Sequence, residues 1–276
     1  MARLKIGSVP YLNALPLIEG LEDKVSVDLT FASPVQLEVD LDRGVLDAAL
    51  VPVITLFDRP HLSMFPFAGI ACEDEAGSVL FFRRPGSELK RVAYDRGSRS
   101  SLTLLRVILA HEGLRPQWVP MDANLDKMLA AADGALLIGD AALAARGDPR
   151  LVFDLGGRWR KQTHMPFVFA VWAARTDHLR RTDLGHLLTD ASAQGLNKLV
   201  AISNRVAGRA GMSAMDILVY FTKNLRYRLG IIHLDALDQF RKLSAALPPM
   251  SEVLASEIPA SPASSNPGAP RPVKIL

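Results

Sequence analysis

The sequence predicts an α/β protein of two lobes with a ligand-binding cleft between them. Short apolar runs typical of strands alternate with longer amphipathic runs typical of helices, which indicates βαβ units and parallel sheets. The same order of elements occurs twice along the chain, as a structural repeat without sequence identity. Two similar lobes would place a ligand at the carboxyl ends of their strands, where α/β sheets commonly bind small molecules.

The first series of elements opens with a short strand at residues 3–9, followed by a polar loop. A second strand is expected at 25–31, and the spacing of apolar residues over 34–47 predicts a helix. An apolar strand at 48–54 completes the series.

The second series repeats this order. A strand at 92–95 precedes a strongly helical run at 100–114. A strand at 117–121, a helix at 124–133 and an apolar strand at 135–140 follow. The last strand comes directly after a short turn, as does the strand that closes the first series.

The chain is expected to pass between the lobes twice. Residues 78–84 would carry it out of the first lobe, and the long apolar strand 167–175 would bring it back. Mostly helix is expected from about 183 to 247. The predicted division is therefore a discontinuous first lobe of residues 1–80 and 172–247, a second lobe of residues 81–171, and a tail of residues 248–276. Because the tail is rich in Pro, Ala and Ser and has no apolar period, we expect it to be disordered.

The composition is that of a protein with a core of its own, with 49% hydrophobic and 22% charged residues. A single cysteine, Cys72, excludes an internal disulfide and fits a reducing compartment. The first residues lack the apolar stretch of a secretory signal, and no apolar run approaches the ~20 residues of a membrane span. We therefore expect a cytoplasmic protein with no membrane insertion.

The net charge of +3 is mild, and the basic residues form no dense stripe or nucleic-acid-binding motif. We expect no nucleic-acid partner, and the sequence indicates no particular oligomeric partner. No Cys, His and carboxylate spacing suggests a metal site, and no motif indicates an organic cofactor. The slight basicity favours a small anionic ligand.

The loop after the first strand lies within Gly7–Leu17 and carries a phenol and an amide, with no acid or base beside them. Tyr11 and Asn13 lie between two prolines, and no titratable partner stands beside them. Asn13 could simply stabilise a turn. It could equally donate a hydrogen bond to a ligand without titrating.

A second polar loop, DRGSRSSLTLL, stands just before the helical run at 100–114. Gly97 would ease the turn, and one of Ser98, Ser100 and Ser101 would cap the helix. Unpaired N–H groups at a helix start also bind carboxylates and phosphates, so the loop is a candidate anion site. It is not a P-loop, because no Gly-Lys-Ser/Thr follows.

Two further loops end strands or precede them. Gly139 and Asp140 follow the strand at 135–140, where a helix cap by Asp140 is favoured over a catalytic carboxylate. Thr163 and His164 stand just before the strand at 167–175, and a lone histidine there is more often structural than catalytic. The residues alone thus predict a two-lobed protein that binds a small, carboxylated molecule through hydroxyls, amides and helix N-termini.

Taken together, the segments GSVPYLNALPL, DAALVPV, DRGSRSSLTLL, LLIGDAAL and THMPFVFAVW resemble the chorismate dehydratases of the futalosine route to menaquinone. The resemblance spans about residues 3–245 and depends on the order of the segments, since each one alone is weak. It implies the type II periplasmic-binding-protein fold, in agreement with the predicted lobes. One position departs from the family pattern, because His164 stands where Gly is expected.

The resemblance implies a hydro-lyase that converts chorismate into 3-[(1-carboxyvinyl)oxy]benzoate, with no metal or organic cofactor. The residues carried over as catalytic are Asn13 and Ser78, and those carried over as substrate-binding are Tyr11, Ser98, Ser100, Ser101, Gly139 and Thr163. The only titratable candidates in the cleft loops are Asp95, Asp140 and His164. We therefore expect the enolpyruvyl carboxylate of the substrate to remove the C3 proton itself.

Two alternatives remain, the first an enzyme of the same pathway and the second a protein of a different class. The related 1,4-dihydroxy-6-naphthoate synthase has the same fold, but its opening loop resembles SPCPNDTF, where this chain has VPYLNALP. A non-catalytic protein that binds small carboxylates is the other alternative. A regulator would need an N-terminal helix-turn-helix and a solute receptor an export signal, and the sequence has neither.

Overall fold

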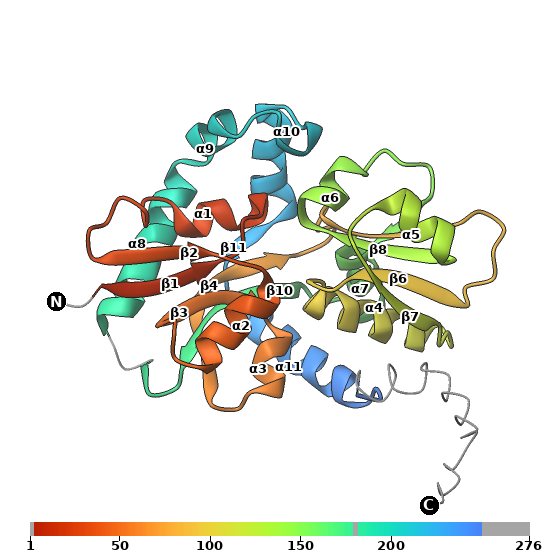
Figure 1. The fold of residues 1–276 in the computed structure, drawn as a ribbon, viewed down its shortest axis with the longest axis horizontal. Coiled ribbons are helices and arrows are strands. Elements are labelled where there is room, and N and C mark those ends of the chain that lie inside the picture. The colour runs from red at the N-terminus through yellow and green to blue at the C-terminus, as the bar shows by residue number, and fades with distance from the viewer. Residues whose placement is uncertain (1–2, 179–181, 250–276) are drawn as a thin grey trace, which may run out of the picture.

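The computed structural model describes residues 3–178 and 182–249 of the chain. Its strands form two sheets, a six-stranded one in the order β11-β4-β10-β3-β1-β2 and a five-stranded one in the order β7-β6-β8-β5-β9. Figure 1 shows the two sheets side by side, each with its own helices. We call the part around the six-stranded sheet the first lobe and the part around the five-stranded sheet the second lobe.

The first sheet combines parallel and antiparallel strands. Strand β1 (Leu4–Ser8) lies between β2 (Val27–Phe31) and β3 (Ala48–Pro52) and is parallel to both. Strand β10 (Phe167–Arg175) pairs antiparallel with β3 and with β4 (Leu62–Cys72). The short strand β11, whose bounds are Arg226–Arg228, pairs with β4 at the edge. Strand β3 is apolar along its length because a central strand is covered on both faces.

The second sheet has a similar parallel centre. Strand β6 (Arg91–Asp95) lies between β7 (Gln117–Met121) and β8 (Gly134–Ile138) and is parallel to both. Strand β5 (Val79–Arg83) runs antiparallel to β8 and to β9 (Leu151–Asp154). The chain enters this sheet between β4 and β5, and it leaves between β9 and β10.

Helices cover both sheets. Their bounds are α1 Leu15–Ile18, α2 Pro34–Asp42, α3 Ile54–Asp58, α4 Arg99–His111, α5 Leu125–Ala131, α6 Gly139–Ala144, α7 Leu155–Thr163, α8 Thr182–Asn197, α9 Leu199–Arg205, α10 Ala214–Val219 and α11 Ile231–Ala245, with short helical turns η1 at Leu12–Ala14, η3 at Arg209–Gly211 and η4 at Tyr220–Asn224. The helix predicted at 100–114 is confirmed as α4. It ends at His111 because Gly113 follows with a φ of +75°, which ends the helical run.

The predicted strands and helices of both series are confirmed, with ends shifted by a few residues. Four of the described strands, β4, β5, β9 and β11, were not predicted, and β4 is the longest of them. Pro66 and Gly69 read as turn signals there, and the pairing with β10 does shift register between Met64 and Gly69. A Cβ on Gly69 would lie 2.6 Å from the carbonyl oxygen of Ala170, so this glycine permits close approach of the two strands.

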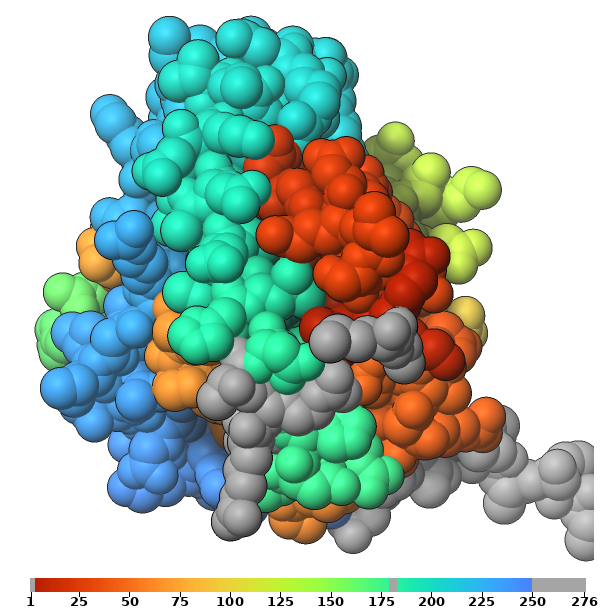
Figure 2. All heavy atoms as spheres, turned by 90° about the vertical axis from the view of Figure 1, so that its left-hand side faces the viewer, coloured from red at the N-terminus to blue at the C-terminus, as the bar shows by residue number. Residues whose placement is uncertain are grey.

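Helix α8 packs closely on α1 at the outer side of the first lobe. Figure 2 shows the blue-green residues of α8 against the red-orange N-terminal residues. A Cβ at Gly195 of α8 would lie 1.9 Å from the carbonyl oxygen of Pro16, so only glycine fits at this crossing. The contact fixes α1, and with it the η1 turn and the loop that join α1 to β1.

An aromatic cluster joins the lobes on the side of α11. Phe240 of α11 lies 4.8 Å from Phe167 at the start of β10 and 6.0 Å from Trp159 of α7, measured between ring centroids. All three side chains are fully buried.

No helix within the described residues is long and apolar enough to cross a membrane. The predicted tail lies outside the described residues from residue 250 onward.

Candidate active site

A small cavity lies between the lobes, at the ends of β1, β3 and β8 and at the start of α4. Its volume is about 70 Å³. The lining residues are Val9, Tyr11, Asn13, Pro34, Leu50, Pro52, Ile70, Gly97, Arg99, Ser100, Ser101, Ile138, Gly139, Phe169 and Ala170. Pockets that hold small ligands usually measure ~300–1,000 Å³, so the space between the lobes is narrow in this structure. Five of the eight residues predicted for the site line this cavity: Tyr11, Asn13, Ser100, Ser101 and Gly139.

Tyr11 and Gly139 face each other across the cavity. Gly139 has a φ of +57°, and a Cβ there would lie 3.4 Å from the ring of Tyr11. That distance is ordinary van der Waals contact, so it is the backbone conformation that requires glycine here. Burial raises the pKa of the Tyr11 phenol, and the nearby Asp95 and Asp140 carboxylates raise it further. The phenol is neutral at ordinary pH, and it can donate a hydrogen bond but cannot serve as a base.

Asn13 lies in the short η1 turn that follows β1. Its Oδ1 atom is buried and has no hydrogen-bond partner among the described residues. A buried polar atom without a partner costs about 1–3 kcal/mol, which a bound ligand would offset. The amide at this position is therefore suited to contact a ligand.

The start of α4 supplies the other polar wall. The N–H groups of Ser100 and Ser101 lie in the first turn, where helical N–H groups have no partner within the helix. The Ser100 hydroxyl accepts a hydrogen bond of 3.3 Å from the N–H of Ile54 in the first lobe. Ser98 is the N-cap residue by position, but its buried hydroxyl makes no capping hydrogen bond. Ser98 is not among the described residues that line the cavity.

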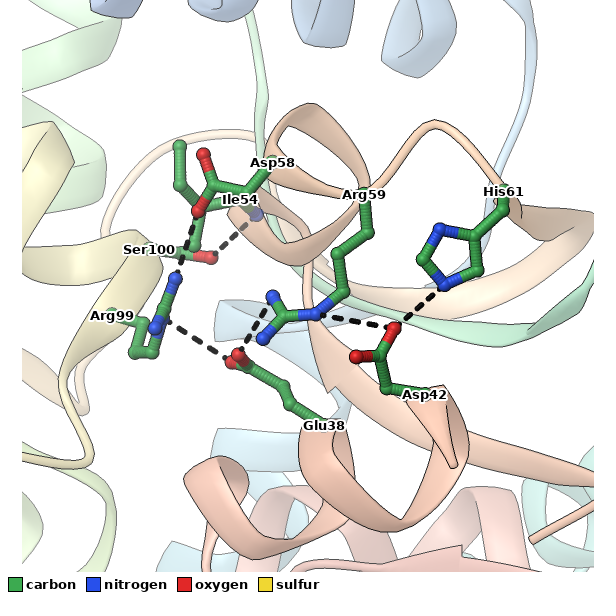
Figure 3. A network of polar contacts seen from close by, with 8 residues as sticks. All are labelled: Glu38, Asp42, Ile54, Asp58, Arg59, His61, Arg99 and Ser100. Carbon is green, nitrogen blue, oxygen red and sulfur yellow. Dashed lines mark hydrogen bonds and ion pairs between the residues drawn. The ribbon is translucent and has the colours of Figure 1, made fainter. Parts of the chain in front are cut away.

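Arg99 is the one charged side chain among the described residues that line the cavity. The sequence pattern does not single it out, because it stands within a run of serines that a helix cap explains. Its Nε atom lies 3.3 Å from Oε1 of Glu38, and its Nη2 donates to Asp58 at 2.9 Å. Figure 3 shows Glu38 between Arg99 and Arg59, with Arg59 at 3.2 Å from Oε2. Arg99 thus lines the cavity, and its guanidinium is held by carboxylates of the other lobe.

Asp140 of the second lobe makes hydrogen bonds to the first lobe next to Tyr11. Its Oδ1 accepts a hydrogen bond of 3.0 Å from the N–H of Leu12, and its Oδ2 accepts one of 2.7 Å from Nε of Arg209. The interpretation of Asp140 as a helix cap is wrong, because α6 is preceded by Ile138 and has no side-chain cap. The carboxylate has its acceptor oxygens engaged, so it is placed to hold the lobes together.

Ser78 lies at the crossing from the first lobe to the second, as the sequence predicts. Its hydroxyl is buried and accepts a hydrogen bond of 2.8 Å from Tyr220, and its carbonyl accepts the N–H of Gly139. Burial raises the pKa of the Tyr220 phenol. Ser78 is absent from the described lining of the closed cavity. Ser78 holds the backbone of Gly139 through this carbonyl, and its catalytic role stays a prediction.

Thr163 lies at the end of α7, beside a different hollow of about 600 Å³ that α4, α7 and α11 enclose. Its hydroxyl donates to the carbonyl of Trp159 at 2.9 Å and accepts the N–H of Met165 at 3.2 Å. His164 follows with a φ of 60°, in the left-handed region that favours glycine. This backbone conformation suits the Gly that the resemblance implies at this position, and the exposed His164 is not among the described residues that line the cavity.

Comparison with solved structures identifies the class of protein. The periplasmic aliphatic sulphonate binding protein SsuA of Escherichia coli matches with a TM-score of 0.63 at 13% identity, over 88% of this chain and 86% of that one. Protein AF1704 of Archaeoglobus fulgidus matches with a TM-score of 0.71 at 14% identity, over 88% and 97%. The chain therefore has the two-lobed α/β fold of the periplasmic binding proteins, and the predicted fold is confirmed.

Comparison of sequences gives the family. The profile of the family described as "Menaquinone biosynthesis" matches residues 4–246. The chorismate dehydratase of Thermus thermophilus is 30% identical over 248 residues, which cover 81% of this chain and 89% of that protein. The chain belongs to this menaquinone biosynthesis family, and the resemblance inferred from its loops is confirmed.

Proposed function

We propose that this chain dehydrates chorismate to 3-[(1-carboxyvinyl)oxy]benzoate. The observation that carries the proposal is the chemistry of the cavity wall. The described wall is mostly apolar, and its polar part consists of an amide, hydroxyls and backbone N–H groups together with the one charged residue, Arg99. Such a wall suits a substrate with two carboxylates and a hydroxyl, and the family match supports chorismate as that substrate.

The reaction removes the proton from C3 and breaks the C4–O bond, so the ring becomes aromatic and one water is released. The C3 proton is vinylogous to the ring carboxylate, and negative charge that develops at C3 spreads into that group. Preorganised donors stabilise such charge without reorganisation. The N–H groups of Ser100 and Ser101 and the Nδ2 group of Asn13 are the donors that we assign to this task. The unpaired Oδ1 of Asn13 is an acceptor, and it would accept a hydrogen bond from the C4 hydroxyl of the substrate.

The base in this proposal is the substrate's own enolpyruvyl carboxylate. None of the described residues that line the cavity is a carboxylate, histidine, lysine or cysteine, and burial raises the pKa of the Tyr11 phenol, which is therefore not a base at neutral pH. The enolpyruvyl group is tethered next to C3, and a well-oriented intramolecular reaction has an effective molarity of up to ~10⁵ M or more. The proton that it takes can then leave with the C4 hydroxyl as water.

In this proposal the lobes enclose the substrate and exclude water. A cavity of about 70 Å³ is too small for the whole substrate, so the space between the lobes must be wider when the substrate is bound. The contacts of Asp140 with Leu12 and Arg209 run between the lobes and would form again on closure. In this proposal closure brings the donors of both lobes onto one ligand.

Incubation of the purified protein with chorismate tests the proposal directly. Mass spectrometry should detect the benzoate product, and the absorbance of chorismate should fall at the same rate. Binding of chorismate without turnover would instead indicate a non-catalytic carboxylate-binding protein. If chorismate is neither bound nor converted, the dehydratase and the chorismate-binding protein are both refuted. Turnover of a later pathway intermediate would indicate the related synthase.

A further inference from the structure

The environment of Glu38 differs from that of an ordinary surface carboxylate. It lies on α2 with only 1% of its side chain exposed, and neither carboxylate oxygen makes a well-formed hydrogen bond to a described residue. Burial raises its pKa, whereas the guanidinium groups of Arg99 and Arg59 act to lower it. A buried carboxylate of this kind is costly unless it is paired, so both arginines are needed to keep it in place.

The two arginines have different surroundings. Arg59 belongs to the first lobe, as Glu38 does, and it is not among the described residues that line the cavity. Arg99 opens α4 in the second lobe, crosses to Glu38 and Asp58, and also lines the cavity (Figure 3). Its contacts to the two carboxylates use Nε and Nη2, and a guanidinium carries five N–H donors in all. Donors therefore remain for a ligand.

We infer that Arg99 binds one of the two substrate carboxylates and that Glu38 is the positioning residue that holds Arg99 for this task. The inference rests on the proposed function, because it assumes a dicarboxylate in the cavity. A dianion needs positive charge, and Arg99 supplies the only formal positive charge in the described lining. Glu38 contacts the guanidinium from the other lobe, so Arg99 takes its place only when the lobes are closed.

Two monocarboxylates separate the roles of the two carboxylate groups. The probe 3-methoxybenzoate keeps the ring carboxylate, and 2-phenoxyacrylate keeps the side-chain carboxylate. Dissociation constants are measured by NMR titration. Arg99→Met should weaken one probe about 10-fold or more, the usual effect of losing a hydrogen bond to a charged group, and should change the other by less than about two-fold. Equal loss for both probes, or no loss for either, would overturn the assignment.

The matched control is Arg106→Met, which removes the same charge two turns further along α4. Arg106 lies outside the described cavity lining, and it donates to the carbonyl of Pro248. Its replacement should leave the ratio of the two dissociation constants unchanged. Thermal unfolding of each variant shows that the fold is intact. Turnover of chorismate by the wild-type protein separates failure of this inference from failure of the proposed function.

The role of Glu38 is tested by a double-mutant cycle. Glu38→Gln should weaken the same probe as Arg99→Met, by a smaller factor, and should have no further effect on that probe when Arg99 is already Met. If the two changes multiply, Glu38 does not act through Arg99, and its positioning role is refuted. Glu38→Asp serves in the same cycle if the glutamine variant does not fold.

Discussion

Replacement of His164 by glycine should stabilise the protein and leave its activity unchanged. His164 ends α7 with a φ of 60° and a ψ of 16°, and its N–H donates to the carbonyl of Arg160 at 2.9 Å. This is the usual left-handed end of a helix, at which glycine is the preferred residue. The backbone bond would be kept in the variant, and the exposed imidazole has little packing to lose.

The magnitude follows from two opposing effects. A side chain in the left-handed region costs roughly 1–2 kcal/mol, which glycine avoids. Glycine in turn loses more conformational entropy on folding, roughly 0.5–1 kcal/mol. The net gain is therefore about 0.5–1 kcal/mol, which raises the melting temperature by about 1–4 °C for a chain of this length.

Urea unfolding followed by circular dichroism measures the gain. Lys161→Gly is the matched control, since it places glycine within α7 at an exposed position with ordinary helical geometry, and it should cost about 1 kcal/mol. A His164→Gly variant that is less stable than the wild type would refute the explanation of the family's glycine by backbone conformation. A large loss of turnover in a folded variant would show that the imidazole takes part in catalysis.

Three further predictions concern the site and the packing behind it. Asn13→Ala should lower turnover by about 10²-fold while the melting temperature changes little, because the variant loses a preorganised donor and no packed core; near-normal turnover would exclude the assigned role. Asp95→Asn should keep turnover within about 10-fold of the wild type, and a loss of ~10⁴-fold with chorismate binding intact would identify a protein base and refute the substrate-assisted step. Gly195→Ala should cost about 3 kcal/mol or more in the free energy of unfolding, since its Cβ would meet the Pro16 carbonyl oxygen at 1.9 Å, and a neutral effect would contradict the close crossing of α1 and α8.

Local pattern was sufficient for most of the fold. The apolar spacing that predicts α4 is that of a helix buried on one face, and the continuous apolar run of β10 is that of a strand buried on both. Strand β4 escaped prediction because its signal is long-range. Pro66 and Gly69 are tolerated only because β10 and β11 pair with β4 on either side of the irregular stretch.

The site was predictable in part for the same reason. Asn13, Ser100 and Gly139 lie at the ends of strands or the starts of helices, where sequence alone can place a ligand. Arg99 could not be predicted as a site residue, because its contact with Glu38 joins segments that are distant in the chain and α2 carries no polar motif. Thr163 was assigned through the resemblance, and the structure places it beside a different hollow.

The division of the cavity wall between the lobes has a consequence for the energetics of turnover. Asn13 and Tyr11 come from one lobe and the serines of α4 from the other, so an open molecule holds only half of the site. The observed affinity for any ligand is then its affinity for the closed form multiplied by the fraction of molecules that are closed. A variant with stronger contacts between the lobes would bind more tightly at equilibrium and release product more slowly. The strength of the Asp140 contacts would therefore affect both the binding of a ligand and the release of product.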